Sequence, residues 1–309
     1  MAAGLDPQIE AWLRAYPSPT VDPRDVSAVR ALAASYMADR GGPAPRWPRD
    51  DVALTAAKVG GVPVLIWAPV STPEPTPVVV ALHGGAFVVG SALGAERIAV
   101  PLAADHGIAT VSVEYRLAPE QPYPAAFDDV VSVLASLGDV EGVDSARVAV
   151  HGSSAGGALA ASAAIWARDQ GYALQLQSLT CPALDHRTAA SDDSEHSMHR
   201  ESPTLSRAAV QAMWDHYLGD AVADSYAVPA LAADLTGLAP AHITVAEYDV
   251  LRNETLDYAE RLRAAGVPVD LDLVGGTVHG FDGLLTESDV SRRAVTRQVC
   301  ALAEALLSR

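Results

Sequence analysis

The chain has 309 residues, of which 50% are hydrophobic and 19% are charged, with 21 Lys or Arg against 38 Asp or Glu. This apolar content is sufficient for a large core and excludes a disordered protein. A net charge of −17 repels phosphate backbones and anionic membrane surfaces, so we expect neither nucleic acid nor a membrane as a partner.

The first 50 residues have a helical pattern. Apolar residues recur at helical spacing in Pro7–Ala15 and in Asp25–Asp39. Because this segment precedes the first strand pattern, we expect residues 1–50 to form part of a cap over the core that follows.

From Val52 onward the pattern is that of strands, which then alternate with helices. Val52–Val59 and Val62–Ala68, joined at Gly60-Gly61, predict an antiparallel hairpin. Further strands are predicted at Val78–His83, Ala109–Tyr115, Val148–His151, Leu176–Pro182, His242–Glu247 and Val269–Val274. Helices are predicted at Glu96–His106, Ala125–Leu137, Ala155–Arg168, Glu254–Ala265 and Val290–Leu307. This alternation indicates an α/β fold with an eight-stranded, mostly parallel sheet and helices on both faces.

One segment interrupts the alternation. Residues 185–228 are first polar and then helical, and they follow a strand on the side where α/β enzymes place lids. We therefore expect a core formed by residues 51–184 and 229–309, with residues 185–228 as a cap insertion.

The motif Gly152-Ser153-Ser154-Ala155-Gly156 lies between a predicted strand and a predicted helix. A serine at such a tight turn exposes its hydroxyl beside a helix N-terminus, and the flanking glycines give the crowded backbone room. Only Ser154 has glycine on both sides at the right spacing. It is therefore the candidate nucleophile.

Two further strand ends carry residues that a serine nucleophile needs. Asp249 follows the predicted strand His242–Glu247, and His279 follows Val269–Val274. The chain order Ser, Asp, His is that of α/β hydrolases. His279 would take the proton from Ser154, and Asp249 would orient the imidazole. Because the base must be neutral, activity should fall as the pH drops through the pKa of His279, near ~6–7 if unperturbed.

A glycine loop, His83-Gly84-Gly85-Ala86, follows the strand Val78–His83. Glycines let backbone N–H groups approach a substrate, where they stabilise a developing oxyanion. We expect His83 to brace this loop through a hydrogen bond and to take no direct part in the chemistry.

Together these motifs resemble the hormone-sensitive-lipase-like branch of the α/β hydrolases. The matching stretches are His83–Ala86, Val113–Glu120, Gly152–Gly157, Glu247–Arg252 and His279–Phe281. The resemblance implies a carboxylesterase that needs no cofactor, with a helical cap. It also implies an oxyanion hole formed by the N–H groups of Gly84, Gly85 and Ala155, and it makes a homodimer through an edge strand unsurprising.

The sequence departs from the family pattern at two positions. Ala86 replaces the third glycine of the loop, which narrows the substrate space by a methyl group. Ser153 stands where the family usually has Asp, so a charge beside the nucleophile is missing.

Candidates for the substrate pocket are aromatic or flexible side chains near these motifs. They are Phe87, Met213, Trp214 and Phe281. Packing between cap and core explains Met213 and Trp214 equally well, whereas Phe87 and Phe281, which follow the glycine loop and the candidate base, are slightly better candidates for the pocket.

Three functions remain open at this point. A serine carboxylesterase for small to medium acyl esters is favoured. An amidase, deacetylase or lactonase would use the same triad, and a ligand-binding receptor would typically have lost the histidine that this chain retains. We expect no metal, because the histidines and acids of Asp185–Glu201 have the composition of a polar loop and lack the spacing of a zinc ligand set.

Cysteine usage and the N-terminal pattern bear on location. Cys181 and Cys300 are too few for a disulfide scaffold, and Cys181 fits a small buried residue. The opening MAAGLDPQIE has no signal-peptide pattern, and no run reaches the ~18 apolar residues of a membrane span. We therefore expect a cytoplasmic protein.

Overall fold

The computed structural model describes residues 4–16, 21–39, 49–72, 75–188 and 202–308. In these residues eight strands form one sheet in the order β1-β2-β4-β3-β5-β6-β7-β8. Their bounds are β1 Val52–Val59, β2 Val62–Pro69, β3 Thr76–Leu82, β4 Ala109–Val113, β5 Val143–Ser153, β6 Leu176–Thr180, β7 Ala241–Tyr248 and β8 Val269–Val278. β2 pairs antiparallel with β1 and with β4, and every other pairing is parallel. The predicted α/β fold with a mostly parallel sheet is confirmed.

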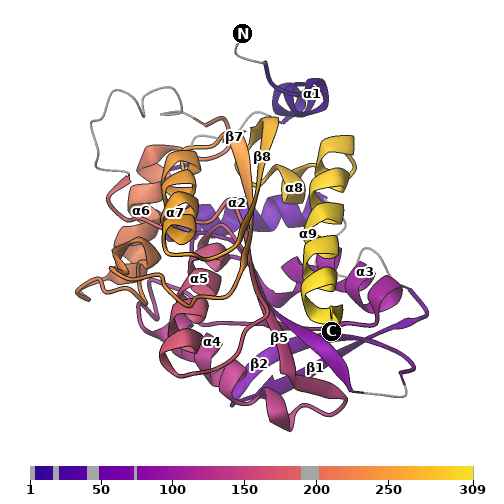
Figure 1. Ribbon diagram of the computed structural model, residues 1–309. Coiled ribbons are helices and arrows are strands. Elements are labelled where there is room, and N and C mark those ends of the chain that lie inside the picture. Colours follow the sequence, from indigo (N-terminus) through magenta and orange to yellow (C-terminus); the bar gives the residue numbers. More distant parts are fainter. Residues whose placement is uncertain (1–3, 17–20, 40–48, 73–74, 189–201, 309) are drawn as a thin grey trace.

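Helices cover both faces of this sheet. Their bounds are α1 Pro7–Ala15, α2 Val26–Asp39, α3 Glu96–His106, α4 Ala125–Ala135, α5 Ala155–Asp169, α6 Arg207–Leu218, α7 Arg252–Ala264, α8 Phe281–Leu284 and α9 Asp289–Leu307. Short 3-10 turns lie at Ala92–Ala95, Leu137–Asp139 and Pro229–Leu231. Figure 1 shows the sheet nearly edge-on, with α3, α8 and α9 on one side and α4, α5, α6 and α7 on the other.

The central strand β3 shows why both faces need cover. All seven of its residues are buried. Val78, Val80 and Leu82 pack into the layer that contains α4, α5 and α6, whereas Val79 and Ala81 pack against α3 and α9. Side chains alternate between the faces of a strand, so a strand that is apolar at every position must be covered on both sides.

Two strands extend beyond their predicted bounds. β5 begins at Val143, which pairs with Thr76. The residues that follow Val143 are mostly polar, so the sequence did not indicate a strand there. β8 continues through Gly275-Gly276, which had suggested a loop. Its register against β7 shifts after Ala246, and Gly276 adopts a φ of 71° there. A bulge of this kind keeps a glycine-containing strand paired.

The segments expected to form a cap are partly described. α1, α2 and α6 are present as helices, as the sequence predicted. Most of the polar run Asp185–Glu201, including His196 and His199, lies outside the described residues. Among the helices that the structure describes, none is long and apolar enough to cross a membrane.

Candidate active site

Ser154 lies on the turn between β5 and α5. Its backbone has a φ of 56° and a ψ of −120°, a conformation that L-residues rarely adopt. A Cβ at Gly152 would lie 2.0 Å from the carbonyl oxygen of Gly156, and a Cβ at Gly156 would lie 2.1 Å from that of Leu82. Only glycine fits at these two positions, so the motif holds the half-buried serine in a strained turn.

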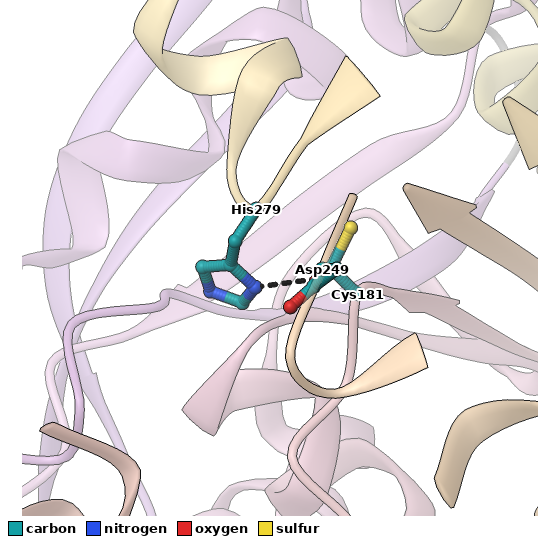
Figure 2. Close-up of side chains that lie close together, drawn as sticks. All are labelled: Cys181, Asp249 and His279. Carbon is teal, nitrogen blue, oxygen red and sulfur yellow. Dashed lines mark hydrogen bonds and ion pairs between the residues drawn. The ribbon is translucent and has the colours of Figure 1, made fainter. Parts of the chain in front are cut away.

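Ser154, His279 and Asp249 form a continuous hydrogen-bonded chain. The distance from Ser154 Oγ to His279 Nε2 is 2.9 Å, and that from His279 Nδ1 to Asp249 Oδ2 is 2.7 Å. Figure 2 shows the imidazole edge turned toward the Asp249 carboxylate. An ionised carboxylate only accepts, so Nδ1 carries the proton and Nε2 is the acceptor for the serine hydroxyl. This tautomer is the one that a general base requires.

The hydrogen bonds that hold Asp249 and His279 in place come from separate parts of the fold. Asp249 directly follows β7, and its Oδ1 accepts a hydrogen bond of 2.9 Å from the N–H of Leu251. His279 directly follows β8, and its carbonyl accepts a hydrogen bond of 2.9 Å from Thr204 Oγ1, which belongs to the insertion. Because β5, β7 and β8 run parallel, their carboxyl ends bring the three side chains to one edge of the sheet.

Opposing effects act on the pKa of His279. Burial lowers it, whereas the charge and the hydrogen bond of Asp249, together with the charge of Asp282, raise it. The net result is a pKa above the ordinary value of 6.5. The carboxylates therefore make the imidazole a stronger base than a free histidine.

The glycine loop after β3 runs past Ser154. A Cβ on Gly84 would lie 3.3 Å from Ser154 Cβ. Gly85 has a φ of 126°, and a Cβ there would lie 2.1 Å from the carbonyl oxygen of Val89, so this position requires glycine. Ala86, in place of the third glycine, adopts a φ of 53°, in the left-handed region that favours glycine.

His83 itself supports this loop. Its Nδ1 lies 2.8 Å from the carbonyl oxygen of Gly84, to which it donates. Burial lowers the pKa of His83 to about 4, against a smaller opposite effect of that hydrogen bond, so the ring is neutral at pH 7. The bracing hydrogen bond expected of His83 is present.

The four predicted pocket residues fall into two groups. Phe87 and Trp214 are neighbours, with ring centroids 5.7 Å apart, and Met213 lies in the same buried cluster. Phe281 is fully buried in another cluster, with Ile9 and Val278. The structure therefore does not bring Phe281 together with Phe87, and Phe281 packs α8 onto the core.

Cys181 lies behind the Asp249–His279 pair, where it is buried as predicted. Its Sγ, a carboxylate oxygen of Asp249 and a ring nitrogen of His279 lie within 4.8 Å of one another, the one grouping in the described chain with the chemistry of metal ligands. The Asp249–His279 hydrogen bond already engages Nδ1 and Oδ2, and burial raises the pKa of the thiol well above its usual range. The arrangement is that of an oriented base with a neutral thiol behind it.

The sequence did not indicate several of the contacts that these groups make. Tyr115 stacks on His83, and Tyr217 stacks on Phe87. Arg97 forms a buried ion pair with Asp282, three residues after His279. Arg30 of α2 donates to the carbonyl oxygen of Val88, next to the glycine loop. Each contact joins segments far apart in the chain, so no local pattern carries it.

Comparison with known proteins agrees with this geometry. Residues 79–283 match the model of a family described as having the alpha/beta hydrolase fold. The carboxylesterase NlhH of Mycobacterium tuberculosis is 36% identical over 255 residues, which cover 79% of either chain. An arylesterase of Saccharolobus solfataricus is 32% identical over 251 residues, 78% of either chain. Among solved structures, a bacterial heroin esterase matches with a TM-score of 0.89 and 33% identity over 98% of either chain.

A nucleophile elbow on a mostly parallel sheet, with this order of strands and helices, defines the class of α/β-fold serine hydrolases. Within that class, this chain belongs to the alpha/beta hydrolase family whose model it matches, the family of hormone-sensitive-lipase-like carboxylesterases. The family membership predicted from the sequence motifs is confirmed.

Proposed function

We propose that this protein hydrolyses carboxylic esters of small to medium acyl groups through an acyl-enzyme on Ser154. The observation that carries the proposal is the chain from Ser154 Oγ to His279 Nε2 at 2.9 Å and from His279 Nδ1 to Asp249 at 2.7 Å. These separations allow a proton to pass between Oγ and Nε2 without a change in the position of either residue.

The reaction has two halves. In the first, Ser154 Oγ attacks the ester carbonyl while Nε2 of His279 takes its proton, and the imidazolium then gives that proton to the leaving alcohol. In the second, water attacks the acyl-enzyme, His279 takes a proton from the water and returns it to Ser154, and the carboxylic acid leaves. Asp249 keeps Nδ1 protonated and stabilises the imidazolium in both halves.

For the oxyanion hole, we propose the N–H groups of Gly84, Gly85 and Ala155. Gly84 passes close to Ser154, and a Cβ there would lie 3.0 Å from the carbonyl oxygen of Ser153, a tight contact. Ala155 is the first residue of α5, and the N–H groups of a first helical turn have no partner within the helix. Donors at these positions stabilise a developing oxyanion by several kcal/mol.

The substrate class follows from the site and from the relatives. The relatives named above are esterases. Phe87 directly follows the glycine loop, and its ring contacts the rings of Trp214 and Tyr217. A small-molecule ester with an apolar acyl or alcohol group fits such surroundings. Met213, from the same helix as Trp214, belongs to this proposed pocket.

Residues 1–50 and 185–228 are proposed to form the cap. Arg30 supports the first part, since its guanidinium donates to the carbonyl oxygen of Val88 at 3.0 Å and pairs with Glu120 at 2.6 Å. Thr204 supports the second part through its hydrogen bond to His279. The homodimer and the cytoplasmic location stay predictions.

The test is hydrolysis of p-nitrophenyl esters from acetate to palmitate, with a p-nitroanilide in parallel. Ser154→Ala should lower kcat/KM by at least about 10³-fold, whereas Ser153→Ala, one residue away, should stay within about tenfold of the wild type. A fluorophosphonate should add one mass adduct to the wild type and none to Ser154→Ala. Full turnover by Ser154→Ala would overturn the proposal, and faster cleavage of the anilide than of the esters would replace the esterase with an amidase.

A further inference from the structure

The ion pair between Arg97 and Asp282 is the most deeply buried one between a guanidinium and a carboxylate in the described chain. Arg97 Nη2 lies 2.6 Å from Asp282 Oδ2, and the two side chains are 15% and 1% exposed. Loss of one partner from such a pair leaves an uncompensated buried charge, which is strongly destabilising. Exposed ion pairs on the surface contribute little to stability, so the burial of this pair sets it apart from them.

The pair connects two segments that flank the active site. Arg97 is the second residue of α3, the helix that follows the glycine loop. Asp282 is the second residue of α8, and Gly280 and Phe281 alone separate it from His279. The guanidinium also packs tightly on α8, because a Cβ on Gly283 would lie 2.5 Å from Arg97 Nη1.

Several charged or titratable groups surround His279. Asp249, after β7, is hydrogen-bonded to Nδ1, and Asp282 acts on the ring through its charge. Burial and the charges of both carboxylates raise the pKa of Cys181, after β6, so its thiol is neutral. His151, on β5, is buried and lies close enough to Arg97 for that charge to lower its pKa, after the larger effect of burial. Asp249 thus bonds to the ring of His279, whereas Asp282 acts on it through its charge alone and is paired with Arg97.

We propose that Asp282 is a positioning residue for the catalytic base, held by Arg97 so that its negative charge stays behind His279 without displacing Asp249 from Nδ1. This role rests on the proposed function, in which His279 is the base. Asp282 favours the imidazolium that forms in both halves of the reaction. Arg97 fixes the carboxylate on α8, so that one carboxylate alone bonds to the ring.

The decisive variant is Asp282→Asn, which keeps the shape of the side chain and removes its charge. The acid limb of kcat/KM should move to lower pH, so that at pH 5.5 the variant retains a larger fraction of its own plateau than the wild type does. The plateau should fall by up to about tenfold, because the imidazolium is less stabilised. Asp289→Asn, which removes an exposed carboxylate from α9, is the matched control and should leave the acid limb in place.

A second variant separates positioning from folding. Asp282→Asn leaves Arg97 buried without a carboxylate, which lowers stability, whereas the double variant Arg97→Gln with Asp282→Asn removes both charges. If Asp282 positions the base, the acid limb should move to lower pH in both variants, and further in the single one, where Arg97 keeps its charge. The double variant should unfold at a higher temperature than the single one. If the pair only holds the fold together, the acid limb stays at the wild-type pH in every variant, and the proposal is overturned.

A direct titration of His279 makes the test independent of catalysis. The imidazole Cε1 resonance of His279, assigned by its absence in His279→Gln, should titrate at lower pH in Asp282→Asn than in the wild type. A wild type without esterase activity would refute the proposed function while leaving this titration valid. An unchanged titration in an active enzyme would refute the role of Asp282 alone.

Discussion

The hydroxyl of Tyr115 donates to the carbonyl oxygen of His83 at 2.7 Å, and its ring stacks on the imidazole of His83 with centroids 4.1 Å apart. Tyr115 thus holds both the backbone and the side chain of the residue that begins the glycine loop. Burial raises the pKa of its phenol far above the usual range, so the hydroxyl remains a donor at every working pH.

Tyr115→Phe should weaken catalysis through this loop. The change keeps the ring stacking and leaves the His83 carbonyl without its donor, which costs about 1 kcal/mol. We expect kcat to fall by roughly three- to tenfold, with a smaller change in KM, because the N–H groups after His83 would be less firmly aimed. Steady-state kinetics with p-nitrophenyl butyrate measure this, and Tyr16→Phe, at an exposed tyrosine, is the control. Unchanged kcat in Tyr115→Phe would mean that the loop holds its shape without the hydrogen bond.

The pH dependence of kcat/KM should report the pKa of His279. Burial lowers that pKa, but Asp249 and Asp282 outweigh it and raise the pKa above 6.5. Since only the neutral imidazole accepts the serine proton, activity should be lost as the pH falls through a value above the ordinary 6.5 of histidine. The pH below which activity is lost should therefore be higher than the value expected for an unperturbed histidine. Rates measured from pH 5 to pH 9 with two esters of different leaving groups test this, and a limb below pH 6 would contradict it.

Asp249→Asn should affect the tautomer of His279 more than the fold. The oxygen of the new amide would still accept the hydrogen bond from the N–H of Leu251, but its nitrogen would donate toward Nδ1. The proton would then move to Nε2, where the base must be free, so kcat should fall by about 10⁴-fold, as this change does in other triads. Burst kinetics and far-UV circular dichroism separate the two effects. Asp257→Asn, at an exposed carboxylate of α7, is the control, and a loss below tenfold in Asp249→Asn would contradict the assignment of Asp249.

Local patterns in the sequence predicted the sheet, which is confirmed, and pointed to Ser154 as the candidate nucleophile. Strands such as β3 are continuous apolar runs, which a parallel sheet buried on both faces requires. Ser154 could be identified because its turn needs glycine at Gly152 and Gly156 for steric reasons that appear in the sequence itself. Asp249 and His279 followed from the rule that parallel strands end at one edge.

Contacts between distant segments could not be predicted in the same way. In the sequence, Arg97 resembles a surface residue on an amphipathic helix. It is buried because α8 packs against it, and its partner Asp282 lies 185 positions further along the chain. Phe281 follows His279 closely, yet the left-handed turn at Gly280, with a φ of 70°, is followed by a helix that carries its ring into the core. Phe281 was predicted to line the pocket because it is close to His279 in the sequence. In the structure it lies in a different cluster from Phe87.

Glu254 predicts an unusual dependence of stability on pH. Its carboxylate, in the first turn of α7, accepts hydrogen bonds from the N–H groups of Leu184 at 2.6 Å and Asp185 at 3.3 Å, where the insertion begins. Burial raises its pKa to about 8, although these bonds and one from Thr188 act in the opposite direction. The folded protein therefore binds this proton more tightly than the unfolded chain, in which the pKa is near 4.5.

The resulting contribution to stability is fully present below pH 4.5 and is lost as the pH rises through about 8. Glu254→Gln keeps an oxygen that accepts from Leu184 and removes the titration. Its free energy of unfolding, relative to the wild type, should therefore rise between pH 5 and pH 8.5, by an amount on the order of a few kcal/mol. Urea unfolding followed by tryptophan fluorescence at several pH values measures the difference, and Glu287→Gln, at an exposed carboxylate, is the control. Parallel curves for Glu254→Gln and the wild type would show that Glu254 is already ionised throughout this range, with the N–H groups of Leu184 and Asp185 outweighing its burial.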